Sequence, residues 1–213
     1  MRRLAALVLA CLLAPVASGA TKPPTTHTKA GLAAARRALL PAGAFPSTWT
    51  STAADKTVPS LVCALAAIDP TGIVELGSAG SPHYRAGKAG PFAAESVYVY
   101  KTPKQAALLW KRLVGPAVER CLAASVTQGS TQDVTFSKTT KLPASAPRVS
   151  GRSAAYRVSA QAATPGQSIA AYFDLVLVAR GASIAALSFS SFSEPPPAGI
   201  EALLSRSAVS RLH

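Results

Sequence analysis

The sequence has few of the side chains that usually carry catalysis or hold metal ions. It contains three histidines and three cysteines in 213 residues. The histidines stand apart at His27, His83 and His213, and neither an H-E-x-x-H nor a C-x-x-C motif occurs, so the sequence gives no support for a metal site. The nine acidic residues are scattered, and no pair suggests acid/base chemistry. We therefore expect a protein that is not an enzyme and has no cofactor or metal ion.

The glycine-rich stretch over residues 77–90, GSAGSPHYRAGKAG, comes nearest to a binding motif. It lacks the G-x-S-x-G spacing of a nucleophile elbow. Its backbone amides could hold an anion with help from nearby cations, although a flexible connection between strands explains the same glycines. The candidate ligand or anion region consists of His83, Tyr84, Arg85 and Lys88.

Residues 1–20 have the pattern of a secretory signal peptide. Arg2 and Arg3 precede an apolar run, and the small residues Ser18 to Ala20 predict cleavage after Ala20. Cys11, in VLAC, leaves open a lipoprotein attached through that cysteine. No later segment is long and apolar enough to span a bilayer. We therefore expect a secreted or extracytoplasmic protein, associated with the envelope at most, with a disordered tether over residues 21–31.

Export of the chain bears on the oxidation state of the two cysteines that remain after signal cleavage. Cys63 and Cys121 remain after cleavage, and two cysteines outside the cytoplasm usually form a disulfide. Two buried thiols that never meet are the alternative. The sequence thus predicts one bridge that ties the end of a helix near Cys121 to an earlier element.

The exported chain is strongly basic, with 20 basic and 9 acidic residues once Arg2 and Arg3 are removed, a net charge of +11. Such a charge attracts anionic partners. Outside the cell these are anionic lipids or envelope polymers, and we expect no nucleic acid partner. Solvated side chains that keep the protein soluble are the simpler interpretation.

The first half of the chain predicts a helix over residues 32–40, a short helix over 61–68, and strands at 72–76, 83–85 and 95–100. Thr102 and Pro103 then form a helix start, with a hydroxyl cap before a proline at the first helical position. Apolar residues recur at spacings of three and four along this helix, and Trp110 lies among them. We expect Trp110 in the core. Gly115 and Pro116 should kink the helix or restart it one turn later.

The second half reads as four strands followed by a helix over residues 198–212. Arg180 and Gly181 separate two strong strands, which predicts a tight hairpin with a positive φ at the glycine. Strands joined by hairpins indicate an antiparallel sheet. The expected fold is therefore α+β, a single domain over residues 32–213 in which helices flank an antiparallel sheet, all on one of its faces.

Several segments in this order resemble a known family. They are LLPAGAFPSTW, the Cys63 region, VYVYKTPKQAALLWKRLVGPAVERC, SAAYRV, LVLVARGASIAALSF and LLSRSAVSRL. Together they resemble the extracytoplasmic sensor domain of mycobacterial Ser/Thr protein kinases and its stand-alone secreted and lipoprotein relatives. The most specific part is a strand, a Thr-Pro-capped helix with Trp110, and then a cysteine. Those sensors have two disulfides, whereas this chain has cysteines for one.

The resemblance implies a helix-flanked antiparallel sheet with a cleft for an unidentified ligand, lined by the sheet face and residues 77–90. The expected function is that of a secreted sensor-type binding module for a small or lipidic envelope molecule. The alternative is an envelope interaction protein that docks a protein partner or an anionic surface through its basic face. No kinase domain accompanies the module, so any sensing must act through binding.

Overall fold

The computed structural model describes residues 25–52, 69, 71–116, 118, 120–122, 124, 135–142, 146–164 and 167–213, with the backbone alone for 135–142, 162 and 164. The predicted signal peptide and the predicted helix over residues 61–68, with Cys63, lie outside this part. The elements, in chain order, are α2 (Lys29–Ala38), η1 (Ala42–Ala44), β1 (Thr50–Thr52), β2 (Glu75–Gly80), β3 (His83–Arg85), β4 (Phe92–Tyr100), α4 (Pro103–Leu113), β5 (Thr135–Leu142), β6 (Arg152–Thr164), β7 (Gln167–Arg180), β8 (Ser183–Phe192) and α6 (Ala198–Arg211).

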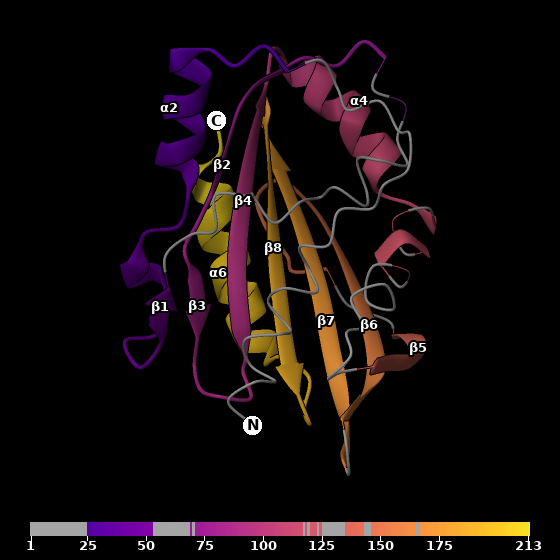
Figure 1. Cartoon of the computed structure of the whole chain (residues 1–213). Coiled ribbons are helices and arrows are strands. Elements are labelled where there is room, and N and C mark those ends of the chain that lie inside the picture. Colours follow the sequence, from indigo (N-terminus) through magenta and orange to yellow (C-terminus); the bar gives the residue numbers. More distant parts are fainter. Residues whose placement is uncertain are drawn as a thin grey trace.

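The strands form one antiparallel sheet in the order β1-β3-β4-β8-β7-β6-β5 (Figure 1). The remaining strand, β2, also pairs with β4. β3 pairs with the start of β4 and β2 with its end, while β8 occupies the other edge of β4. β2 and β3 therefore follow one another along a single position, and the sheet is seven strands wide. The predicted α+β fold with an antiparallel sheet and packed helices is confirmed.

Helices lie on both faces of this sheet, so the expectation of helices on one face is wrong. α2 and α6 share one core with the sheet, and α4 shares a second core with the opposite face. Figure 1 shows α6 behind the strands and α4 in front of their upper ends. The reason is visible in the central strands. β4 and β8 are buried along nearly their whole length and show no alternation between inside and outside.

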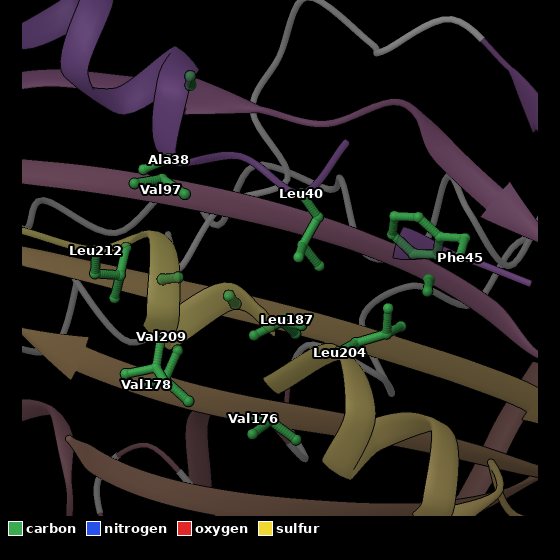
Figure 2. Packing of buried hydrophobic residues seen from close by; sticks show 14 of the residues in the cluster. Ala38, Leu40, Phe45, Val97, Val176, Val178, Leu187, Leu204, Val209 and Leu212 are labelled. Carbon is green, nitrogen blue, oxygen red and sulfur yellow. The ribbon is translucent and has the colours of Figure 1, made fainter. Parts of the chain in front are cut away.

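The core beneath α2 and α6 is built from small and branched side chains. Figure 2 shows Val97 of β4 against Ala38 of α2, and Val178 of β7 against Val209 of α6. Leu204, on α6, lies in the same cluster and has no exposed surface. Leu204, Ala208 and Val209 are therefore on the face of α6 that packs on the sheet.

The core beneath α4 confirms the assignment made for Trp110. The helix buries Ala106, Leu109, Trp110 and Leu113 against Tyr98 and Tyr100 of β4 and apolar residues of β6, β7 and β8. Thr102 caps the helix by accepting a hydrogen bond from the Gln105 amide at 3.2 Å. Regular helix ends at Leu113, and residue 116 is helical again after Gly115. The predicted restart at Gly115-Pro116 is thus confirmed.

The hairpin predicted at Arg180-Gly181 is also present. Arg180 pairs with Ser183, so Gly181 and Ala182 form a two-residue turn. Gly181 has φ +57, and a Cβ there would collide with the backbone of His213. Both the turn geometry and this close contact therefore require glycine.

Folded structure begins earlier in the chain than expected. The amide of Thr26 donates to the carbonyl of Glu75 at 3.0 Å, and the amide of Thr28 donates to that of Leu76 at 2.9 Å. Thr28 then caps α2, which starts at Lys29. Residues 25–31 therefore belong to the folded body, and the predicted tether boundary at residue 31 moves toward the N-terminus. Among the described residues, no helix has the length and apolar character needed to cross a membrane.

Candidate functional site

The four residues of the predicted ligand or anion region do not form one site. Tyr84 is buried on the α2 and α6 side of the sheet, where its ring stacks on Phe45 with 3.6 Å between centroids. His83 is also buried, but as its neighbour in β3 it points to the opposite face. Arg85 and Lys88 are exposed, and the Arg85 Nε donates to Thr50 Oγ1 at 3.1 Å. The structure thus leaves both cations at the surface and places the two rings on opposite faces of the sheet.

The glycines at the start of this stretch serve helix packing. Gly77 of β2 lies against Gly31 of α2, and a Cβ on either residue would collide with the backbone of the other element. β2 extends to Gly80, so the residues GSAG at 77–80 are strand. The strand that the sequence predicts over 72–76 starts only at Glu75. The short strand predicted over residues 83–85 is confirmed. The close approach of α2 to the sheet accounts for both glycines without an anion.

Cys121 is half-buried in the helical residues that follow Pro116, while its predicted partner Cys63 lies outside the described residues. The bridge therefore stays a prediction. Non-reducing peptide mapping should find one cross-linked Cys63–Cys121 pair. Reduction should lower the unfolding free energy by roughly 2–4 kcal/mol, measured as a fall in Tm. Two thiols that alkylate readily in the native protein would refute the pairing.

A buried ion cluster joins α6 to the sheet, and the sequence reasoning missed it. Arg157 of β6 stands opposite Asp174 of β7 in the strand register. Its guanidinium donates through Nε to Asp174 Oδ1 at 2.6 Å and through Nη2 to Asp174 Oδ2. The same Nη2 lies 3.3 Å from Glu201 Oε1, in the first turn of α6. Two carboxylates thus share one cation beneath the helix.

The charges of this cluster are strongly perturbed. Burial raises the pKa of Glu201, and its hydrogen bond to Asp174 and the charge of that carboxylate raise it further. The hydrogen bonds that Arg157 donates to Asp174 raise the pKa of its guanidinium. A protonated Glu201 beside an Asp174–Arg157 ion pair leaves the cluster close to neutral, which suits its buried position.

Glu95 is a second buried carboxyl, at the centre of β4 beneath the end of α2. Its side chain is 1% exposed, and Oε2 accepts the amide of Leu40 at 2.6 Å. Burial raises the pKa of Glu95 to about 7, against the lowering effects of the Leu40 bond and the charge of Arg211. Burial, followed by the charge of Glu95, raises the pKa of Tyr84. The carboxyl thus links β4, β3, the end of α2 and the end of α6.

A third buried carboxylate, Glu75, lies at the start of β2. His27 Nε2 is 3.2 Å from Glu75 Oε1, and Tyr100 stands opposite Glu75 in β4. Burial and the charge of Glu75 raise the pKa of the Tyr100 hydroxyl well above its usual range. Through His27, this carboxylate holds the segment before α2 against the sheet.

Each of these carboxylates ties one layer of the fold to another, and the arrangement contains no nucleophile beside a general base. Among the described residues, no group of three or more His, Cys, Asp or Glu side chains could hold a metal ion.

Glu95 should make the protein more stable in mild acid than at neutral pH. Its folded pKa of about 7 exceeds the ordinary value of 4.5, so only the folded state keeps the proton between these limits. Stability from this group is complete below pH 4.5 and is lost as the pH rises through 7, by about 3 kcal/mol in all. Denaturant unfolding of wild type and Glu95→Gln at pH 5, 6, 7 and 8 measures this.

The Glu95→Gln variant keeps a carbonyl oxygen for the Leu40 amide but cannot ionise, so its stability should change less across this range and exceed that of wild type at pH 8. Glu194→Gln, at an exposed carboxylate, is the control and should follow wild type. Parallel pH profiles for wild type and Glu95→Gln would show that Glu95 does not titrate in this range.

No known protein-family model matches the chain, and no curated protein matches it. The functional interpretation therefore starts from the fold, the buried groups and the resemblance described above.

Proposed function

We propose that this protein is an extracytoplasmic, non-enzymatic binding module of the sensor-domain type, which takes up a small or lipidic envelope molecule in a cleft against its sheet. The observation that most supports the proposal is the arrangement of the segment from Phe92 to Leu113. There a central strand runs into a Thr102-capped helix, and Trp110 packs on the sheet. This is the most specific part of the resemblance, and it lies in the helix-flanked antiparallel sheet that the resemblance implies.

The ligand would lie on the face that carries α4, beyond the end of that helix. The core beneath α4 is formed at the Tyr100 end of β4 and the Ile184 end of β8. Farther along the same face, β4 carries Ser96, and β8 carries Ser190 and Phe192, all buried. Apolar area with a few fixed hydroxyl groups is typical of small-molecule sites.

Native mass spectrometry of the protein purified from the envelope of its own host tests the proposal. We expect a species heavier than the polypeptide by one ligand mass, which denaturation removes. Ser190→Ala should reduce the ligand-bound fraction, whereas Ser210→Ala, at an exposed position on α6, should leave it unchanged. A polypeptide found only at its own mass, with no rise in Tm on addition of envelope lipid extract, would refute a ligand-binding function.

A second candidate is an interaction module that docks through a basic surface. One observation favours it. The carboxylates of Glu75, Glu95, Asp174 and Glu201 are all buried. In the part of the chain with described side chains, only Asp69 and Glu194 expose a carboxylate. The positive charge of the chain therefore meets little opposing charge on that surface.

A further inference from the structure

Five exposed cations gather at the end of the sheet where β7 turns into β8. We call this the hairpin end, after the turn at Gly181 and Ala182. Its cations come from four different elements and from the residue that follows β4, and they are Lys29, Lys101, Lys104, Arg152 and Arg180.

Hydrogen bonds and strand register place these cations together. Tyr100 donates to the carbonyl of Ala182 at 2.9 Å, which sets Lys101 beside the turn. Arg180 precedes the turn, and Arg152 pairs with Ala179 in the next strand. Lys104 lies in the first turn of α4, three residues after Lys101.

Lys29 joins the group through β2. It follows Thr28, whose amide bonds Leu76, and the amide of Lys101 donates to the neighbouring Val74 carbonyl at 3.0 Å. The start of α2 therefore reaches the same end of the sheet as Lys101 (Figure 1).

The spacing lets these charges act jointly. Neighbouring strands lie about 4.8 Å apart, so the cations of β6, of β7 and of the residue after β4 spread over roughly 14 Å. The screening length is about 8 Å at physiological salt, so Arg152 and Arg180 lie within each other's field, and Lys101, about 10 Å from Arg180, lies near its limit. The two exposed carboxylates among the described side chains lie elsewhere, and the oxygen of His213 at this turn accepts bonds from Ala182 and Ser183. Asp69 is 3.5 Å from Arg112, toward the far end of α4, and Glu194 follows the opposite end of β8.

The chain that links the fold to its predicted export leader also meets this end. Thr25 pairs with Glu75 at the start of β2, opposite Tyr100. Only 13 residues separate Thr25 from Cys11, the alternative lipid attachment point in the sequence. Whether the leader is cleaved at the membrane or the chain is held there by a lipid, the segment that leads to the bilayer enters the fold beside the cations.

We propose that the hairpin end is a membrane-contact surface that seats the protein on anionic phospholipid headgroups. This deepens the second candidate function by assigning its surface and its partner. The backbone of His213 packs on the turn at Gly181 and Ala182, so the contact with headgroups falls to the long side chains around it. These lysine and arginine side chains reach the phosphates.

Flotation with vesicles of phosphatidylcholine, with and without about one-third phosphatidylglycerol, tests the proposal. The exported chain should bind the anionic vesicles, and binding should weaken as salt rises. Each basic residue near such a surface contributes roughly fivefold to partitioning. Lys101→Gln with Arg180→Gln should therefore lower the partition coefficient by about 25-fold. The control, Arg85→Gln with Lys88→Gln at the opposite end of the sheet, changes the net charge equally and should retain binding within about twofold.

A dye on Ala182→Cys should shift to shorter wavelength when anionic vesicles are added, whereas the same dye on Ala89→Cys, beside Phe192, should not. Equal losses in the two paired variants would show that net charge alone drives binding and would overturn the hairpin end as the contact surface. Full competition by polyglutamate without a dye shift would identify a diffuse polyanion as the partner. Absence of wild-type binding would refute the membrane proposal while leaving the ligand-binding function to its own mass measurement.

Discussion

Replacement of Arg157 by methionine should lower the free energy of unfolding by roughly 3–5 kcal/mol, because it leaves the buried carboxylate of Asp174 without its cation. Asp174 is 4% exposed and receives both bonds from the guanidinium. Glu201 loses the same partner. Methionine fills similar space, so most of the loss comes from charge and hydrogen bonding. The measurement is urea unfolding at pH 7, with the m-value compared between variants to confirm the same transition.

Two further variants separate this explanation from a simple packing defect. Arg152→Met, at an exposed position on the same strand, should change stability by less than about 0.5 kcal/mol. Removal of the partner charges together, as Arg157→Met with Asp174→Leu and Glu201→Leu, should recover much of the loss, since apolar groups can replace a buried ion cluster. A triple variant no more stable than Arg157→Met would show that the cluster's charges are not the source of the cost.

Half of this cluster could have been predicted from the sequence. Thr164 of β6 pairs with Gln167 of β7, so two residues link the strands, and this register sets Arg157 opposite Asp174. Asp174 interrupts the apolar run of β7 and Arg157 stands opposite it, which signals a cross-strand ion pair. The contribution of Glu201 could not be found in the same way, because it depends on how α6 is rotated about its axis over the sheet.

Glu95 shows a similar limit. A lone carboxylate in FAAESVYVY marks an unusual buried position, but the group that binds it is the backbone amide of Leu40, 55 residues away. A sequence does not show which backbone amide will donate a hydrogen bond to a given side chain. The same holds for Gly31 and Gly77, which are glycine because each faces the other across a helix–strand contact.

Local signals were sufficient where the structure depends on near neighbours. The Thr102 cap, the restart after Gly115 and the turn at Gly181 each follow from a few adjacent residues. The placement of helices on both faces required the burial of whole strands. The apolar run from Ile184 to Leu187 in β8 was the available sign, because a strand with one solvent-exposed face would alternate between apolar and polar residues.

Replacement of Trp110 by alanine should also cost roughly 3–5 kcal/mol, since it empties the space of a large aromatic group in the core beneath α4. The indole is 8% exposed and belongs to the cluster that holds Leu109, Leu113 and Tyr98. That loss would be a large fraction of the stability of an ordinary domain. Thermal unfolding measures it, with Lys111→Ala, on the exposed side of the same helix, as the control expected to unfold near the wild-type temperature.

Fluorescence gives an independent test, because a buried indole emits at short wavelength and resists acrylamide. Trp49 is only partly buried, so the measurement belongs in a Trp49→Phe background, where Trp110 is the remaining tryptophan. We expect blue-shifted emission and weak quenching. The alternative is an indole that lines the proposed ligand cleft, as aromatic groups often do in binding sites. Ready quenching, together with an unchanged Tm for Trp110→Ala, would overturn the packing role and make Trp110 the first residue to test for ligand contact.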